Sequence, residues 1–594
     1  MVENNEAQME RVEIAVATPR RFGRGAKFSC RKKASGCRLH ATRRNDGRCV
    51  GKRCDLQQAP VTTFEQFGDV RIFRPSHGTE SFIRRRARNH LLSRFSPGEY
   101  RGAEAANAVI QHQFKFYENM LQPMVPQLAS RGAAEFLLFQ YDEAWRLIHG
   151  KGILDLRERE RWERIEPNLK RAIKYLVELI CLTQFNSGAK PTREEALFAT
   201  ESALVCAESM AQLSHESDLA HAIFPDDCVV RVYDSEPLDY KISVEGRFTG
   251  YDRAFSDRII RDRNSRNRFV DFPQFDHHTP THQKYLDEPF TQSFGMSYGE
   301  FIYAIRAVIE GSQPSLHPQS FPTLFVNRAR VLEEIKKFNP LRPSAAIERA
   351  IEGFSVSPAA LKVDKRVVWN PKQESRAYRR GFFVFPHESG HHLAFSREMA
   401  KESLMQLVFW VCFKRLPAEW RTPETLKALD GLSLAASEWF EGIICRNLQS
   451  LGILGQRRHR TIGSGHSQIQ IPDAVGEIDF LGYHAEQNLL VLAEAKMVMT
   501  GLEARYWRDD LDEFVFRSGS YAERFRRKLT WVAENRHAIS AALGFSPAVE
   551  VGCAMLTLYP CIARAFIPDF PCVSVTEFML DYERARRWPY LTVK

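Results

Sequence analysis

Apolar residues recur three and four positions apart over much of the first third of the chain. Apolar residues with this spacing line one face of an α-helix, so each such segment predicts an amphipathic helix. Breaks that contain Gly and Pro separate the segments. The segments are residues 103–118, 133–149, 166–183 and 193–213. The pattern therefore predicts a helical region over residues 61–225.

The pattern changes after this helical region. Residues 228–233 and 240–244 are short runs rich in Val, Ile and Tyr, which predict two strands and thus a small β insertion. Residues 258–282 are rich in Arg, Asp and His with few apolar positions, which predicts a long surface loop. Helical spacing then resumes. We expect residues 226–430 to form a mixed α/β region of unknown role.

Residues 431–594 alternate between helical and strand-like patterns. A helical segment is followed by three strand-like runs, a long helical segment and two further apolar strand-like runs. In chain order these segments are residues 437–448, 467–472, 476–483, 489–496, 521–543, 549–558 and 572–575. The order predicts an α/β domain with an αβββαβ core behind a mostly α-helical N-terminal region.

Two of these strand-like runs are separated by a short polar segment, which predicts a β-hairpin. If the four residues after His484 form the loop, His484 pairs with Leu489 and Asp479 lies opposite Glu494. Glu494 and Lys496 are two residues apart on one strand, so they point to the same face. The hairpin is therefore expected to gather two carboxylates and an ammonium group.

These three side chains suit metal-assisted hydrolysis of a phosphodiester. Two neighbouring carboxylates repel each other unless a cation lies between them. Hard oxygen ligands suit Mg²⁺, and Mn²⁺ is the expected substitute. The adjacent Lys496 can orient a metal-bound water, help to deprotonate it, or neutralise charge that develops on a phosphate.

At these residues the chain resembles the PD-(D/E)XK nuclease superfamily, which has the restriction-endonuclease-like fold. The family has an Asp at the end of one strand, D/E-x-K on the next strand, and usually a Glu on an upstream helix. Asp479 and Glu494-Ala495-Lys496 match this pattern. Glu441 is our choice for the upstream Glu, with Glu438 as the alternative. The resemblance covers the chain from about residue 433 onward, and it implies that Asp479, Glu494 and Glu441 bind the metal and act in catalysis with Lys496.

The resemblance also implies a nucleic-acid substrate, with DNA favoured over RNA, and roles such as restriction, antiviral defence or repair. Arg457, Arg458 and Arg460 precede the first predicted strand of this region. Two interpretations stay open for them, namely contacts with phosphate groups and a solvated loop. Because an uncontrolled nuclease is toxic, we expect a homodimer or a partner protein to gate the activity.

Composition agrees with a nucleic-acid partner and disfavours a membrane protein. The net charge is +10 and the isoelectric point is near 9.0, which favours a polyanionic partner. Residues 1–60 are strongly basic with few apolar positions, which predicts a disordered segment. The 12 Cys residues are scattered, as in reduced cytoplasmic proteins. The longest strongly apolar run, residues 404–413, is too short to span a bilayer.

A first alternative is a protein that binds nucleic acid through the same fold without cutting it. The presence of all three motif residues, Asp479, Glu494 and Lys496, argues against this alternative.

A separate basic cluster lies in the middle of the chain. It consists of Arg376, Arg379 and Arg380, and we interpret it as a contact with a phosphate backbone.

A second alternative is a zinc metalloprotease. His387, Glu388 and His391 fit the His-Glu-x-x-His pattern of such enzymes. The chemistry requires both histidines on one face of a continuous helix. The apolar runs on either side instead predict two strands, with residues 388–390 as the turn between them. This places the two histidines on different strands.

Overall fold

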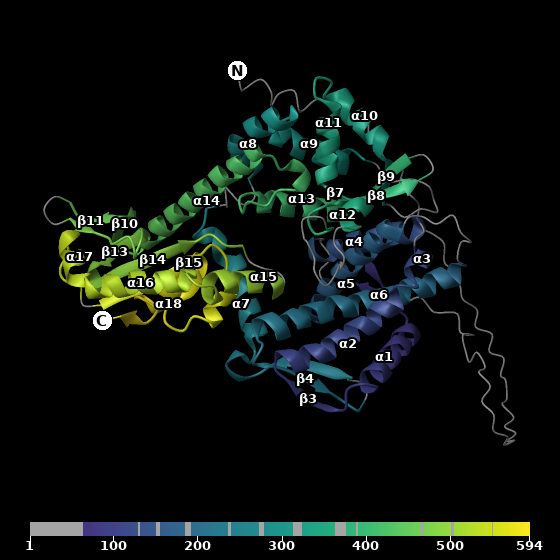
Figure 1. Ribbon diagram of the computed structural model, residues 1–594, viewed down its shortest axis with the longest axis horizontal. Helices are drawn as coiled ribbons and strands as arrows, with labels where there is room; N and C mark the ends of the chain where they lie inside the picture. The colour runs from purple at the N-terminus through teal and green to yellow at the C-terminus, as the bar shows by residue number, and fades with distance from the viewer. Residues whose placement is uncertain are drawn as a thin grey trace. The chain divides into compact units, whose positions relative to one another are not determined.

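The computed structural model in Figure 1 is mostly helical and contains several small sheets. It describes residues 63–128, 131–149, 155–183, 192–235, 239–271, 278–312, 323–362, 376–387, 390–464, 468–499, 504–548 and 550–593. The predicted disordered segment over residues 1–60 lies outside the described residues.

The first region is built from long helices, as the apolar spacing predicts. Its helices are α1 (His77–Leu92), α2 (Ala103–Leu121), α3 (Val125–Leu128), α4 (Arg131–His149), α5 (Leu156–Thr183) and α6 (Arg193–Asp218). Strands β1 (Thr63–Phe67) and β2 (Val70–Arg74) pair with each other, and β3 (Gly98–Arg101) pairs with β4 (Cys228–Val232), which pairs with β5 (Tyr240–Val244). The four predicted helices and both predicted strands of the β insertion are therefore confirmed.

The loop predicted over residues 258–282 is wrong at both ends. Helix α7 (Tyr251–Ser265) covers its first part, and residues 279–282 are the start of helix α8 (Thr279–Phe294). Arg258 on α7 donates hydrogen bonds of 2.6 and 3.1 Å to the carboxylate of Glu577 on helix α18 (Val575–Ala585). α7 also buries Phe255 in an apolar core, but its many charged residues hide this narrow apolar row in the sequence.

The middle region combines helices with a four-stranded sheet. Its elements are α8 (Thr279–Phe294), α9 (Tyr298–Gly311), β6 (Leu324–Asn327), α10 (Arg328–Phe338), α11 (Ser344–Gly353), β7 (Ser355–Val356), α12 (Pro358–Lys362), β8 (Phe382–His387), β9 (Gly390–Phe395) and α13 (Arg397–Val411). Among the described strands the order in this sheet is β6-β9-β8-β7.

The last region contains a larger mixed sheet. Its helices are α14 (Pro423–Ser450), α15 (Ala504–Leu511), α16 (Tyr521–Glu534), α17 (Arg536–Ala542) and α18. Its strands are β10 (Ile453–His459), β11 (Thr461–Ile462), β12 (Ile469–Gln470), β13 (Ile478–His484), β14 (Leu489–Lys496), β15 (Glu550–Thr557), β16 (Cys572–Ser574) and β17 (Thr592–Val593). The described strands follow the order β10-β13-β14-β15-β16, and β17 pairs with β15. β13 is antiparallel to β10 and β14, whereas β14, β15 and β16 run parallel.

The first strand of this sheet is not the one that the sequence predicts. The predicted strand at residues 467–472 is reduced to β12, which pairs with β11 outside the main sheet. β10 takes the edge position instead. Its consecutive exposed residues Gln456, Arg457 and Arg458 hide the alternation that marks a strand.

Helices cover both faces of this sheet. Leu490 and Leu492 of β14 belong to a core with Phe525 and Val532 of α16. Val491 and Ala493, which alternate with them, belong to a second core with residues of α14 and α18. Because side chains alternate along a strand, α16 covers one face, and α14 and α18 cover the other. Position 494 therefore points to the α16 face.

The predicted regions pack together. The first core combines side chains of α2, α4, α5 and α6 with Phe383 of β8, and the second combines Phe224 and Phe255 with the sheet of the last region. Contacts join residues 58–594 into one unit. The predicted boundaries at residues 225 and 430 stay predictions. In the described part of the chain, no helix is long and apolar enough to cross a membrane.

Candidate functional site

The β13–β14 hairpin has the register that the sequence predicts. His484 pairs with Leu489 next to the loop, and the ladder continues to the pair Phe480–Ala493. Asn488 closes the loop with φ +48°, a left-handed conformation that Asn tolerates better than most residues. Asp479 and Glu494 occupy the next positions on the two strands.

Lys496 joins the two carboxylates. Its Nζ donates a hydrogen bond of 2.7 Å to Glu494 Oε1 and lies 3.7 Å from Asp479 Oδ2. The backbone N–H of Ala495 donates to the same Asp479 oxygen at 2.9 Å. The ammonium group thus lies where a cation contacts both carboxylates, and the predicted trio is brought together.

A second ammonium group, from Lys528 of helix α16, completes the cluster. Its Nζ donates a hydrogen bond of 2.6 Å to the other Glu494 oxygen, Oε2. Both groups are buried, with Glu494 4% and Lys528 6% exposed. The sequence did not predict that Lys528 binds Glu494. Its signal is its place at helical spacing among the apolar residues Phe525, Leu529 and Val532.

The buried charges shift one another's pKa values. Burial and the neighbouring charge of Glu494 raise the pKa of Asp479 to about 6. Burial also opposes ionisation of Glu494, but Lys496 and Lys528 outweigh it and lower the pKa of that carboxyl. Burial disfavours the Lys496 ammonium, yet Glu494 and Asp479 outweigh this effect and raise its pKa. The cluster therefore holds two carboxylates and the Lys496 ammonium group at neutral pH.

Glu441, the predicted upstream carboxylate, has a different partner. It lies on α14, which covers the opposite face of the sheet, and Arg458 Nε donates a 2.6 Å hydrogen bond to its Oε2. Arg458 also donates to Glu438 Oε1 at 2.8 Å. Within the described ranges, no group of three or more His, Cys, Asp and Glu side chains is arranged to hold a metal ion. The structure thus unites Asp479 with Glu494 and Lys496, while Glu441 and Glu438 bind Arg458.

Asp479 and Glu494 are the residues that could hold a divalent cation. Both are hard oxygen donors on neighbouring strands, and the Lys496 ammonium already occupies a cation position between them. Glu441 does not contribute to that position, because its carboxylate is bound to Arg458. The residues present therefore supply two of the three predicted ligands.

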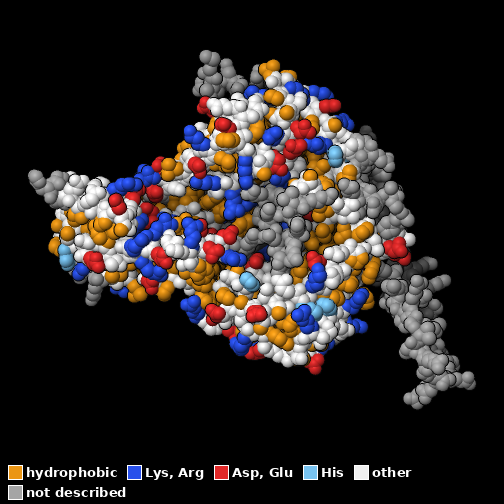
Figure 2. Space-filling model, viewed as in Figure 1, with side chains coloured by type: hydrophobic (Ala, Val, Ile, Leu, Met, Phe, Trp, Pro, Cys, Tyr) orange, Lys and Arg blue, Asp and Glu red, His pale blue; other side chains and the backbone are white. Residues whose placement is uncertain are grey.

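The three predicted nucleic-acid contacts are exposed. Arg457 and Arg458 lie on strand β10 rather than on a loop, and Arg460 directly follows the strand and donates to Glu477 at 2.8 Å. Figure 2 shows Lys and Arg side chains gathered on the last region near α14, β10 and α16. Their accessibility to solvent is compatible with phosphate contacts.

The His-Glu-x-x-His segment lies on a hairpin, as predicted. His387 ends β8 and pairs with Gly390, while Pro386 pairs with His391 on β9. The segment therefore lacks the continuous helix that would place both histidines on one face, and this geometry disfavours the metalloprotease. Residues 388–389 lie outside the described residues.

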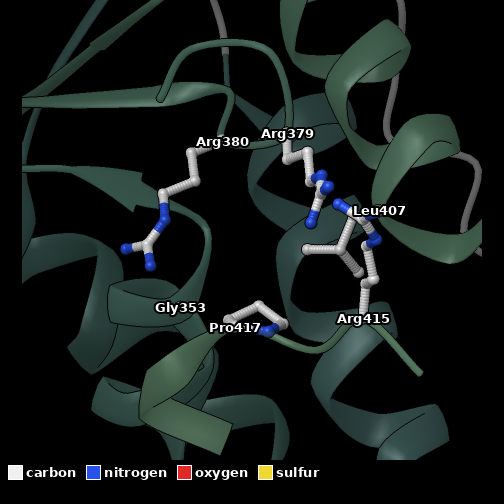
Figure 3. Close-up of a pocket in the computed structure, with 6 residues that line it drawn as sticks. All are labelled: Gly353, Arg379, Arg380, Leu407, Arg415 and Pro417. Atoms are coloured by element: carbon white, nitrogen blue, oxygen red, sulfur yellow. The ribbon is translucent and has the colours of Figure 1, made fainter. Parts of the chain in front are cut away.

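The arginine cluster that follows residue 375 is buried rather than turned toward solvent. Arg376 forms an ion pair with Glu178, and Arg380 donates hydrogen bonds of 2.9 and 2.8 Å to Glu419. Figure 3 shows Arg379 beside Arg415 at a small cavity, and the Arg379 guanidinium lies 3.6 Å from the ring centroid of Trp410. A phosphate backbone cannot reach these groups as they stand, so this interpretation is wrong for the described structure.

Searches of protein-family models, of curated proteins and of solved structures find no match to this chain.

Proposed function

We propose that the last region of this chain is a nuclease that uses a divalent metal ion to hydrolyse phosphodiester bonds. The observation that carries the proposal is the buried cluster of Asp479, Glu494 and Lys496 at the end of one hairpin. The order α14, β10, β13, β14, α16, β15 agrees with the αβββαβ core that the resemblance implies, which supports a restriction-endonuclease-like domain. Helices α15 and α17 and the short strands β11 and β12 are additions to that order.

The cluster supplies the parts of this chemistry. Asp479 and Glu494 are the residues that would hold Mg²⁺ or Mn²⁺, which acts as a Lewis acid toward water and phosphate when it is bound. The Ala495 N–H fixes Asp479, so that this carboxylate keeps its place without a metal ion. Lys496 carries a proton and stabilises the charge that develops on the phosphate in the transition state. Glu441 is not part of this cluster, because it lies on α14 at the opposite face of the sheet and binds Arg458.

Exposed arginines on β10 and α16 support a nucleic-acid substrate. Arg457 and Arg460 lie at β10, and Arg524 and Arg527 are exposed on α16. Such groups bind phosphates irrespective of sequence, and they position a strand beside the cluster. We keep DNA as the favoured substrate, in restriction, antiviral defence or repair in the cytoplasm. Control by a homodimer or by a partner protein belongs to the same proposal.

Cleavage of nucleic acid tests the proposal directly. The wild-type chain is compared with Asp479→Ala and Lys496→Ala on plasmid, linear duplex, single-stranded DNA and RNA, in Mg²⁺, in Mn²⁺ and in EDTA. We expect metal-dependent cleavage that falls about 100-fold or more in both variants. Lys427→Ala, which alters an exposed lysine of α14, is the matched control and should cleave as the wild type does. Cleavage that survives both site substitutions would assign the activity to another site.

One observation favours a second candidate, a nucleic-acid-binding protein that does not cut. Both oxygens of Glu494 are already bound by lysines, so the cluster is balanced in charge without a metal ion. For this candidate we expect binding of the same substrates in a gel-shift assay and no cleavage in Mg²⁺ or Mn²⁺. Cleavage that depends on Asp479 would exclude it.

A further inference from the structure

Lys528 occupies an unusual position for a lysine. It lies in the middle of the buried face of α16, between Phe525 and Val532, and only 6% of it is exposed. Lysine is among the residues least often buried, because its charge loses its hydration there. Its ammonium group donates a 2.6 Å hydrogen bond to Glu494 Oε2, which is its hydrogen-bond partner among the described residues.

Stability alone does not account for the ion pair between Lys528 and Glu494. A buried ion pair contributes little compared with an apolar pair of the same volume, because desolvation offsets the attraction. The contact does have one definite effect, because it fixes Oε2 of Glu494. The other oxygen of this carboxylate, Oε1, binds Lys496, which also contacts Asp479. An ion pair that fixes a carboxylate beside a cation position orients a ligand.

The two lysines of the cluster differ in their surroundings. The Lys496 side chain is 18% exposed, contacts both carboxylates and lies 5.1 Å from the ring centroid of Tyr521. The Lys528 side chain is 8% exposed and, in the described structure, binds only Glu494. Lys496 therefore occupies the place that a divalent ion would take, whereas Lys528 binds the other oxygen of Glu494, Oε2.

We propose that Lys528 is a positioning residue, which holds Glu494 in place while Lys496 gives way to a divalent cation. This inference rests on the proposed function, because it concerns the same carboxylates. It assigns different roles to two lysines that bind the same side chain. Charge alone would make them equivalent, since each places a positive group beside Glu494 and each would repel a cation.

A charge-only account and a positioning role for Lys528 predict opposite changes in metal affinity when Lys528 is replaced. If only charge matters, removal of either ammonium group tightens the binding of a divalent cation. If Lys528 positions Glu494, Lys496→Met tightens binding because a competing cation is removed, and Lys528→Met weakens it by about tenfold or more. Lys528→Arg keeps a cation on the same helix position and is expected to restore most of the affinity.

The test measures Mn²⁺ binding to the full-length chain by electron paramagnetic resonance, without nucleic acid. The wild type is compared with Lys496→Met, Lys528→Met and Lys528→Arg, and Asp479→Ala gives the background from other sites. Circular dichroism monitors folding. If Lys528→Met does not fold, Lys528→Ala replaces it, because it removes the donor to Glu494 and leaves space for water beside that carboxylate. Weaker binding in the variant that lacks the donor supports the inference, and tighter binding overturns it.

Cleavage measured on the same preparations separates the failure of this inference from that of the proposed function. If the wild type binds Mn²⁺ through Asp479 and Lys528→Met binds it equally or more tightly, the positioning role is wrong and the nuclease proposal stands. If the wild type shows neither Asp479-dependent Mn²⁺ binding nor cleavage, the metal-dependent nuclease is wrong, and the role of Lys528 falls with it.

Discussion

Asp479 is a carboxylate in surroundings that favour its neutral form. Burial and the charge of Glu494 raise its pKa to about 6. At neutral pH Asp479 is therefore ionised in the folded protein, although the fold would be more stable with the neutral acid. Residues whose charge opposes folding are typical of functional sites, because selection for stability alone would remove them. This reasoning predicts opposite effects for the two carboxylates of the cluster.

Asp479→Asn is expected to stabilise the protein at pH 7.5 by about 1–3 kcal/mol. Because the folded pKa lies above the ordinary value of 3.8, the destabilisation by this charge is complete above pH 6 and disappears as the pH falls below 4. The gain in the variant should therefore shrink with falling pH. Urea unfolding of both proteins in EDTA at pH 7.5 and pH 4 measures it. A variant that is less stable than the wild type at pH 7.5 would contradict this account.

Glu494→Gln is expected to act in the opposite direction. The substitution leaves the ammonium groups of Lys496 and Lys528 without their shared carboxylate in a buried place. Breaking a buried ion pair in this way typically destabilises a protein by about 3 kcal/mol. The same urea experiment at pH 7.5 gives the value, and equal stability of Glu494→Gln and the wild type would show that the lysines find other partners.

At the residue scale, the sequence predicts what one hairpin can bring together. Asp479, Glu494 and Lys496 follow from strand alternation and from one loop, and both are local properties of the chain. Lys528 lies 34 residues beyond Glu494 on another element, so its contact depends on how α16 packs on the sheet. The same holds for Glu441, because its contact with Arg458 can be predicted only when the position of β10 in the sheet is known.

At the element scale, β10 and β13 pair through two glycines. Gly455 lies opposite Gly482 in the antiparallel ladder. A Cβ atom added at Gly455 would lie 2.5 Å from Gly482 Cα, 2.5 Å from the Leu481 carbonyl oxygen and 2.7 Å from the Phe480 ring. Two of these neighbours are backbone atoms that cannot move without changing the strand pairing.

Gly455→Ala is therefore expected to destabilise the protein by about 2 kcal/mol through the forced separation of β10 from β13. Gly431→Ala is the matched control, because Gly431 lies inside α14 and an added Cβ meets nothing within 4 Å. The control should gain about 0.5–1 kcal/mol from the higher helix propensity of Ala. Thermal unfolding of the two variants is compared with that of the wild type. Equal melting temperatures for both variants would show that the strands can separate without loss.

The elements that the sequence predicts wrongly share a physical cause. β10 is an edge strand with Arg457 and Arg458 exposed in succession, and α7 buries a narrow apolar row around Phe255 between charged residues such as Arg258. Apolar periodicity finds elements that bury wide apolar faces, as α2 and α6 do, and it misses narrow apolar faces among charged residues. Predicting these would require knowing their partners.

At the scale of the whole molecule, ion pairs join elements that are far apart in the sequence. Arg376 binds Glu178, Arg258 binds Glu577, and Glu402 of α13 binds Lys170 of α5. With 83 Lys and Arg and 73 Asp and Glu residues in the chain, charge alone cannot identify such pairs from the sequence. Because low pH protonates the carboxylates of these ion pairs, it should weaken the contacts between the elements that they join. Glu402 offers the clearest test.

Burial opposes ionisation of Glu402, but Lys174 and Lys170 outweigh it and lower the pKa of this carboxyl to about 2. Because the folded pKa lies below the ordinary value of 4.5, the carboxylate stabilises the fold above pH 4.5, and this contribution is lost as the pH falls toward 2. Glu402→Gln should therefore lower the free energy of unfolding by about 2 kcal/mol at pH 7 and by much less at pH 3.

Urea unfolding at the two pH values checks this prediction, with Glu534→Gln, an exposed position on α16, as a control that should change stability at neither pH. The side chain of Glu402 is 27% exposed, so part of its charge is solvated and the expected loss lies below the value that the full pKa shift would give. A loss of equal size at pH 7 and pH 3 would mean that Glu402 stabilises the contact between α13 and α5 through packing and its hydrogen bond from Tyr141, and that charge has no part in it.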